Sequence, residues 1–269
     1  MFNRILFPLD LSERSLHMFD HLPELRRLGA EEAILLFVTV PGQDVSAEQR
    51  STLDRIGRGL EDASMSPREV IASGDPVDEI LKVAEREEAD LIAMTSSGKG
   101  RVKELFVGST CLGVLRSAAR PVLLHKASAD AGSSLLERAL VPLDMTSCPI
   151  VADEVVPSLI RHGLSEALLF HVVPSSDHSI DDQARFEEAA DLLDRIKERL
   201  AGKGCDVTTH VHFGTVSYNI LEAAQEVGAS IIVLGTHRRS VLRDVVLGGN
   251  SEDVIRRSPF PLLVVPCER

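Results

Sequence analysis

The sequence predicts an α/β protein made of two tandem doubly wound domains, each with a five-stranded parallel sheet. Two observations predict this fold class: the chain repeats itself, and within each copy short apolar runs alternate with longer segments of helical period. The 269 residues are enough for two domains that each bury a core. A hydrophobic content of 44% with 26% charged residues is typical of a globular protein, so we expect the whole chain to fold.

The internal repeat is visible in four pairs of segments. With an offset of 134 residues, RILFPLD at 4–10 returns as RALVPLD at 138–144, and AILLFV at 33–38 returns as ALLFHV at 167–172. With an offset of 140 residues, ADLIAMTSS at 89–97 matches ASIIVLGTH at 229–237, and FVGSTCLGVLRSAARP at 106–121 matches VLGGNSEDVIRRSPFP at 246–261. The offset grows by six residues because the second copy is longer in its middle, and longer helices or loops can accommodate these residues.

The repeat sets the expected domain limits. We place domain 1 at 1–126 and domain 2 at 137–269. Between them lies KASADAGSSLL at 126–136, whose small and polar opening predicts a flexible connector.

Apolar runs of strand length recur five times in each copy. In the first copy they lie at 3–9, 33–40, 67–72, 89–95 and 121–125, and in the second at 137–143, 166–172, 206–213, 229–235 and 260–265. Because these runs are nearly continuous in Ile, Leu and Val, we expect helices on both faces of each sheet.

Helix signals stand between the strands. A capped amphipathic helix is expected over 13–28, since Ser12 precedes Glu13 and Gly29 follows the last turn. Its apolar residues recur at a spacing of three: Leu16, Phe19, Leu22 and Leu25. Asp75 and Pro76 mark the start of another helix.

Bulk composition excludes several classes of function. The formal net charge is −12, from 41 acidic and 29 basic residues, so we expect no general affinity for nucleic acid or anionic membranes. Aromatic residues are only 4%, which disfavours a base-stacking surface. No apolar stretch reaches membrane-spanning length, and the opening run reaches Pro8 and Asp10 too soon for a signal peptide. A cytoplasmic protein is the simplest expectation.

The four cysteines show no motif. Cys111, Cys148, Cys205 and Cys267 stand far apart without a C-x-x-C pair, which argues against a zinc site or a redox motif. We expect them to be small buried hydrophobes.

Three segments of each copy end where an open parallel sheet binds its ligands, beyond the carboxyl ends of the strands. The first strands end in Asp10 and Asp144. The fourth strands are followed by expected loops at 95–100 and 235–240. Beyond these come Gly108 with Ser109, and 248–249, each just before a helix whose first amides can hold a phosphate.

These segments resemble the universal stress proteins that bind ATP. Those proteins carry a glycine, two residues, a glycine, nine residues, and then a glycine with Ser or Thr on this loop and helix start. The first copy matches with Gly98, Gly108 and Ser109 but has Thr95 in place of the first glycine. The second copy matches with Gly235 and Gly248, with Arg238 and Gly249 as departures.

The resemblance covers nearly the whole chain and implies a Rossmann-like, adenine nucleotide alpha hydrolase-like fold with strand order 3-2-1-4-5. It also implies ATP or AMP as the ligand and no structural metal. By resemblance the first site comprises Asp10, Val38, Met94, Thr95, Gly98, Gly108, Ser109 and Cys111. The second comprises Asp144, Val172, Leu234, Gly235, Arg238, Gly248, Gly249 and Ser251.

Other interpretations of these residues stay open. The two aspartates can instead cap the helices that follow, and the glycines can serve only as turns and helix starts. Arg238 can close the phosphate space or pair with a phosphate.

Three further groups are weaker candidates. SGKG at 97–100 lacks the flanking residues of a phosphate-binding P-loop. His210 and His212 point the same way from one strand but have no evident third metal ligand. A basic cluster runs from His237 through Arg238 and Arg239 to Arg243, where a solvated loop and a phosphate or partner contact are both open.

No catalytic arrangement is evident, so we expect at most weak ATP hydrolysis. The leading hypothesis is a universal stress response protein that binds ATP or AMP as a regulatory ligand in one or both domains. The alternative is a stress scaffold that acts through protein contacts without nucleotide. The resemblance further implies an internal pseudo-dimer through the last strand of each domain. The sequence leaves a homodimer of the whole chain open.

Overall fold

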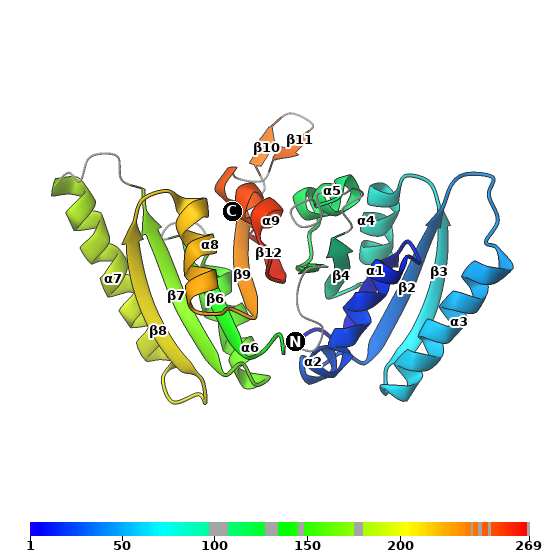
Figure 1. Cartoon of the computed structure of the whole chain (residues 1–269), viewed down its shortest axis with the longest axis horizontal. Helices are drawn as coiled ribbons and strands as arrows, with labels where there is room; N and C mark the ends of the chain where they lie inside the picture. Colours follow the sequence, from blue (N-terminus) through cyan, green and yellow to red (C-terminus); the bar gives the residue numbers. More distant parts are fainter. Residues whose placement is uncertain are drawn as a thin grey trace. The chain divides into compact units, whose positions relative to one another are not determined.

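A computed structural model describes residues 1–96, 107–126, 134–144, 148–174, 180–237, 239–241, 244–246 and 249–267 (Figure 1). The chain divides into two compact units, unit 1 (Met1–Ser133) and unit 2 (Ser134–Arg269). The finer limits 1–126 and 137–269 stay predictions. The expected connector at 126–136 is too long, because Lys126 closes a strand and Leu135 and Leu136 are both 2% exposed.

Unit 1 is a parallel sheet of order β3-β2-β1-β4-β5. Its elements are β1 (Arg4–Leu9), α1 (Glu13–Leu16), η1 (His17–His21), α2 (Leu22–Arg27), β2 (Glu32–Thr39), α3 (Ala47–Asp62), β3 (Ser66–Ser73), α4 (Pro76–Arg86), β4 (Leu91–Ser96), α5 (Ser109–Ser117) and β5 (Val122–Lys126). This is the order 3-2-1-4-5 that the resemblance implies.

Unit 2 repeats this arrangement in the order β8-β7-β6-β9-β12. Its elements are β6 (Arg138–Pro142), η2 (Val151–Val155), α6 (Val156–Arg161), β7 (Glu166–Val173), α7 (Ile180–Leu200), β8 (Asp206–Phe213), α8 (Val216–Glu226), β9 (Ile231–His237), β10 (Arg239–Val241), β11 (Asp244–Val246), α9 (Gly249–Arg257) and β12 (Leu262–Cys267). The short strands β10 and β11 pair as an antiparallel hairpin.

Helices cover both faces of each sheet, as the continuous apolar strands predict. In unit 1, α3 packs on β2 and β3, while α4 packs beside α5. In unit 2, α7 packs on β7 and β8, while α8 packs beside α9. Figure 1 shows α3 alongside β3 and α7 alongside β8.

Each unit has its own ion pair at the amino end of its first strand, in equivalent positions of the repeat. Arg4 Nε lies 2.7 Å from Glu32 Oε2, and Arg138 Nε lies 2.6 Å from Glu166 Oε2. Each guanidinium makes a second bond to the other carboxylate oxygen, so both pairs are bidentate. The repeated sequence therefore gives repeated side-chain contacts.

The expected helix at 13–28 is broken rather than continuous. Ser12 caps α1 by accepting a bond from the Ser15 amide at 3.3 Å, but the chain then passes through the 3-10 segment η1 before α2 begins. Pro23 stands in the first turn of α2, where proline is tolerated because those amides have no partner within the helix. Beyond α2, Gly29 adopts a φ of 99°, the left-handed conformation that favours glycine.

The loops expected at 95–100 and 235–240 start too early. Thr95 and Ser96 belong to β4, and Gly235 to His237 belong to β9. The neighbouring strands extend this far, since β12 pairs Val265 with Gly235 and Cys267 with His237. The expected loop begins at Gly235, but Gly235 lies in β9, where the Cys148 sulfur comes close to its backbone.

Three of the four cysteines are not the simple buried hydrophobes that the sequence predicts. Cys148 and Cys267 form a disulfide, with Cα atoms 5.5 Å apart and a sequence separation of 119. Cys111 and Cys205 form no disulfide; Cys111 is buried and Cys205 is partly exposed. Sequence spacing did not reveal the pair because the fold, not a local motif, brings the two residues together.

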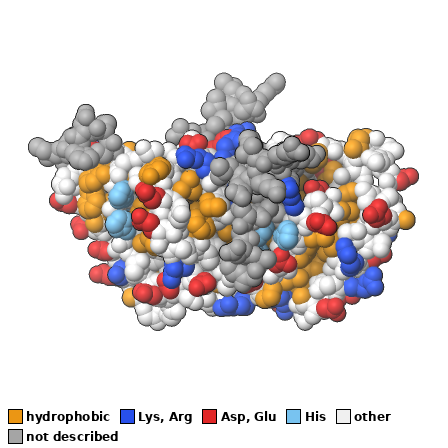
Figure 2. Space-filling model, viewed as in Figure 1, with side chains coloured by type: hydrophobic (Ala, Val, Ile, Leu, Met, Phe, Trp, Pro, Cys, Tyr) orange, Lys and Arg blue, Asp and Glu red, His pale blue; other side chains and the backbone are white. Residues whose placement is uncertain are grey.

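Within the described parts of the chain, no helix is long and apolar enough to cross a membrane. On the face shown in Figure 2, acidic and basic side chains are interspersed among apolar ones.

Candidate functional site

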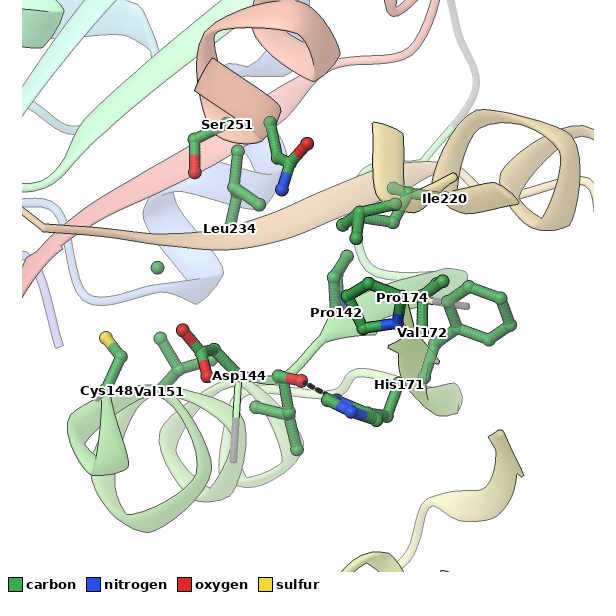
Figure 3. Close-up of a pocket in the computed structure, with 15 residues that line it drawn as sticks. Pro142, Asp144, Cys148, Val151, His171, Val172, Pro174, Ile220, Leu234 and Ser251 are labelled. Atoms are coloured by element: carbon green, nitrogen blue, oxygen red, sulfur yellow. Dashed lines mark hydrogen bonds between the residues drawn. The ribbon is translucent and has the colours of Figure 1, made fainter. Parts of the chain in front are cut away.

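Unit 2 holds a cavity of about 310 Å³ beyond the carboxyl ends of β6, β7 and β9 (Figure 3). Its volume lies at the small end of the range for small-molecule sites, roughly 300–1,000 Å³. The lining residues come from these strand ends and from the first turns of η2, α8 and α9. They are Pro142, Leu143, Asp144, Cys148, Val151, Phe170, His171, Val172, Pro174, Val216, Ile220, Leu234, Gly235, Asn250 and Ser251.

Asp144 supplies the carboxylate of the pocket. It directly follows β6, and Figure 3 shows its side chain pointing into the cavity between Cys148 and Leu234. The preceding residue, Leu143, is held on both backbone groups. Its amide donates to the Phe170 carbonyl at 2.8 Å, and its carbonyl accepts a 2.7 Å bond from His171 Nδ1. These two hydrogen bonds fix the backbone immediately before Asp144.

One side of the cavity is apolar. Val172 at the end of β7, Ile220 in α8 and Leu234 in β9 are all at most 5% exposed, and Pro174 joins them. Figure 3 shows Val172, Pro174 and Ile220 grouped on the side of the cavity away from Cys148. This wall suits a flat apolar ring.

The first turn of α9 forms the polar end. Asn250 and Ser251 line the cavity there, and Figure 3 shows Ser251 on the α9 side, above Leu234. The first amides of a helix have no partner within the helix and carry a partial positive charge, so this end favours an anion. Gly249 opens α9, and a Cβ built on it would have nothing within 4 Å.

The wall of η2 carries an uncommon turn. The five residues of η2 are π-helical, and the Val156 amide donates to the Val151 carbonyl five residues earlier. Pro157 follows in the first turn of α6 and has no amide to donate. Single π-turns of this kind are found frequently at functional sites.

Gly235 forms the floor beside the disulfide. A Cβ built on Gly235 would lie 2.6 Å from Cys148 Sγ and 3.2 Å from Cys267 Sγ. Real Cβ atoms do not approach a sulfur so closely, so the backbone and the disulfide fit only because residue 235 is glycine.

Unit 1 places the equivalent residues at equivalent strand ends. Asp10 follows β1 and accepts bonds from the Ser12 hydroxyl at 2.6 Å and the Ser12 amide at 3.0 Å. Partial burial alone would raise the pKa of Asp10, but these hydrogen bonds outweigh it and the pKa is lowered. The interpretation of Asp10 as a helix cap is wrong, because Ser12 is the N-cap of α1 and Asp10 holds Ser12.

The remaining described residues of the first predicted site lie on β2, β4 and α5. Val38 is in β2, and the buried Met94 and Thr95 are neighbours in β4. The Thr95 hydroxyl is buried without a hydrogen-bond partner, and its carbonyl accepts a bond from Cys111 Sγ at 3.6 Å. Gly108 is the N-cap of α5.

The structure thus brings five residues predicted from sequence into one pocket of unit 2: Asp144, Val172, Leu234, Gly235 and Ser251. Gly249 stands beside the lining but is not part of it. Gly98, Arg238 and Gly248 lie outside the described residues, as does SGKG at 97–100. Sequence reasoning missed Cys148, Ile220 and His171. The apolar spacing of Ile220, Ala223 and Ala224 in α8 is a signal from which Ile220 could have been found.

The structure adds little support for the other weak candidates, the histidine pair and the basic cluster. The rings of His210 and His212 on β8 lie 5.9 Å apart, and the described residues contain no group of three side chains suited to a metal. Of the basic cluster, His237 ends β9 and Arg239 opens β10, while Arg238 and Arg243 lie outside the described residues.

Comparison with known proteins gives one family. The sequence profile of the universal stress protein family matches residues 1–126 and again residues 135–266. A universal stress protein of Methanocaldococcus jannaschii, MJ0577, is 31% identical over 155 residues, which span 47% of this chain and 96% of the relative.

Solved structures agree over the full length. A universal stress protein from Archaeoglobus fulgidus is 28% identical with a TM-score of 0.78, and the match covers 98% of both chains. A protein from Pseudomonas aeruginosa described as a putative universal stress protein shares the fold with a TM-score of 0.76, at 18% identity over 99% of this chain and 94% of that one.

Proposed function

Because the chain belongs to the universal stress protein family, we propose that it binds an adenine nucleotide, ATP or AMP, as a regulatory ligand in the unit 2 pocket. The observation that carries the proposal is the meeting of Asp144, the apolar wall and the first turn of α9 around one cavity. The family supplies the class of ligand, and the cavity supplies a place for each part of it.

Each part of a nucleotide has a matching surface. The purine ring lies against Val172, Pro174 and Ile220, where burial of apolar surface favours it. A ribose hydroxyl donates to the Asp144 carboxylate, a charge-assisted bond that is stronger than a neutral one. The phosphate faces the first amides of α9 and the Ser251 hydroxyl.

The described lining holds a phosphate through neutral donors. Asp144 is the one charged side chain among the described lining residues. In the proposed complex the first amides of α9 and the Ser251 hydroxyl therefore hold the phosphate nearest to that helix. Arg238, which the family pattern places at the phosphates, lies outside the described residues.

A second site in unit 1 rests on sequence. Gly108 and Ser109 match the family pattern at the start of α5, and Asp10 stands at the end of β1 as Asp144 does at the end of β6. Thr95 stands where the pattern has glycine. We propose this site as the weaker of the two.

A nucleotide-independent scaffold is the second candidate. Two observations favour it. Gly235 has a structural reason for being glycine, since the disulfide packs against it. Gly249 in place of a hydroxyl residue also removes one phosphate contact of the family pattern.

Nucleotides released from the purified protein test the proposal. The protein is denatured with acid after extensive washing, and the supernatant is analysed by mass spectrometry for AMP, ADP and ATP. We expect adenine nucleotide in a sub-stoichiometric to equimolar amount. Absence of nucleotide from the supernatant, together with no thermal stabilisation by added AMP or ATP, would favour the scaffold.

A further inference from the structure

The Cys148–Cys267 disulfide is part of the wall of the unit 2 pocket. Cys148 lines the cavity, and Figure 3 shows its sulfur on the same side as the Asp144 carboxylate. Cys148 is 8% exposed and Cys267 is 4% exposed. Because Cys148 lines the cavity, a small reagent that enters the cavity meets the Cys148 sulfur first.

The disulfide joins two elements that frame the site. Cys148 stands four residues after Asp144 and three before η2, which supplies Val151 to the wall. Cys267 is the last residue of β12, which pairs in register with β9 from Leu262 to Cys267. The bond thus ties the wall that follows Asp144 to the strand pair that carries Leu234 and Gly235.

The fit at Gly235 couples the bond to the pocket floor. The Gly235 backbone lies against both sulfurs, so close that a Cβ on Gly235 would reach 2.6 Å from Cys148 and 3.2 Å from Cys267. Bonded sulfurs lie about 2.05 Å apart, whereas non-bonded heavy atoms need roughly 3.5–4 Å. Reduction therefore forces the two sulfurs apart in a space that β9 already limits, and the wall carrying Cys148 has to shift.

From this geometry we propose that Cys148 and Cys267 are a redox site that controls nucleotide binding in unit 2, with the disulfide form binding more tightly. The inference rests on the proposed nucleotide function of the same pocket. In a reducing compartment a disulfide is more often redox-sensing or catalytic than structural, which agrees with the expectation of a cytoplasmic chain.

The reaction is thiol–disulfide exchange with a dithiol reductant. A thiolate of the reductant attacks Cys148 Sγ from the cavity, forms a mixed disulfide with it, and releases Cys267 as the leaving thiolate. The second thiolate of the reductant then attacks its own bonded sulfur and releases Cys148. Two electrons pass to the protein, two protons complete its thiols, and the reductant leaves as a disulfide.

The other two cysteines do not compete for this bond. The Cys111 thiol is buried in unit 1. Burial, with Asp206 nearby, raises the pKa of the Cys205 thiol to about 11, so at neutral pH almost none of it is the thiolate that exchange requires. The redox response of the protein therefore comes from the Cys148–Cys267 pair alone.

Linkage gives the proposal a two-way test. If the disulfide raises nucleotide affinity by some factor, bound nucleotide must favour the disulfide by the same factor. Calorimetric titration with AMP is run on the oxidised protein and on protein reduced with dithiothreitol. The dithiol–disulfide equilibrium is measured in dithiothreitol redox buffers, with and without AMP, by alkylation and mass spectrometry at Cys148 and Cys267. We expect both factors to be about five-fold or more.

Two variants sharpen the result. Cys267→Ser removes the bond and should bind AMP as the reduced protein does, with no response to dithiothreitol. Cys205→Ser is the matched control, because Cys205 precedes the amino end of β8 and is not among the residues that line the cavity. It should keep the full redox response. The same titration of Asp144→Ala identifies the unit 2 contribution, because the binding heat that this variant loses comes from the unit 2 pocket.

Equal AMP affinity of the oxidised and reduced forms, or a redox response that persists in Cys267→Ser, would overturn the inference and leave the proposed function standing. Absence of AMP, ADP and ATP binding in both forms would overturn the proposed function, and the inference with it.

Discussion

Gly235 and Cys148 are packed so closely that a single methyl group on Gly235 would come within 2.6 Å of the Cys148 sulfur. The contact joins the end of β9 to the segment that follows Asp144, so one glycine serves both the disulfide and the pocket floor. This relationship explains a glycine within a strand, a position that otherwise weakens a sheet.

Gly235→Ala should therefore destabilise unit 2. Adding a methyl group to a filled site costs about 1–3 kcal/mol, and the cost should fall in reduced protein, where Cys148 is free to shift. Denaturant unfolding of the oxidised and reduced forms measures both values. Gly249→Ala is the matched control, because a Cβ there meets nothing within 4 Å. Equal effects of the two substitutions would contradict the close fit.

Asp144→Ala should weaken nucleotide binding in unit 2 by about ten-fold to a hundred-fold, since it removes the carboxylate that accepts a ribose hydroxyl. Titration calorimetry with AMP measures the loss. Asp191→Ala, on the exposed part of α7, is the control and should bind as the original protein does. An unchanged affinity in Asp144→Ala would remove Asp144 from the site.

Gly108→Phe should abolish nucleotide binding in unit 1 and leave unit 2 unaffected. Gly108 has φ −61° and ψ 157°, a conformation open to any residue, so the substitution fills the space before α5 without straining the backbone. Binding stoichiometry measures the effect, and Gly59→Phe on the exposed side of α3 controls for added bulk. A stoichiometry that Gly108→Phe does not change would mean that unit 1 holds no nucleotide at this position.

Acid should destabilise unit 1 through a buried histidine pair. His21 Nε2 and His125 Nδ1 share a 2.9 Å hydrogen bond, and both rings are 3% exposed. Burial, with His21 and His17 nearby, lowers the pKa of His125 from 6.5 to about 4, and burial also lowers the pKa of His21. Because the unfolded chain takes up these protons more readily, stability is lost as pH falls below about 6.5, and the loss levels off near the folded pKa.

The pKa change of His125 corresponds to about 3 kcal/mol at the acid end. Urea unfolding at a series of pH values from neutral to 5 measures the slope, before most carboxylates titrate. His125→Gln keeps a hydrogen-bonding side chain without a titrating ring and should flatten the slope. A slope that does not change in that variant would place the acid sensitivity elsewhere.

The sequence predicts most of the fold because both faces of each sheet are buried. Strands such as β1 and β4 then show up as continuous apolar runs, and the parallel order follows from the helices between them. Strand ends were less well predicted. At β9 the pairing with β12 extends through Gly235 to His237. The length of the neighbouring strand decides where β9 ends, and the residues of β9 alone do not reveal that length.

The candidate site was predicted in part. Asp144, Val172 and Leu234 were found because they stand at strand ends, and strand ends of a parallel sheet meet at one edge. Cys148 was missed because its partner is 119 residues away and only the packing of β12 beside β9 brings it close. The break of the 13–28 helix into α1, η1 and α2 was missed as well, because tertiary packing overrides an apolar spacing that is otherwise regular.

The central claim is that the unit 2 pocket binds an adenine nucleotide, and calorimetric titration of the oxidised full-length chain with AMP tests it most directly. We predict binding with a dissociation constant in the micromolar range, and a loss of the unit 2 component in Asp144→Ala. No heat of binding with AMP, ADP or ATP at millimolar concentration would contradict the claim and make the scaffold the better account.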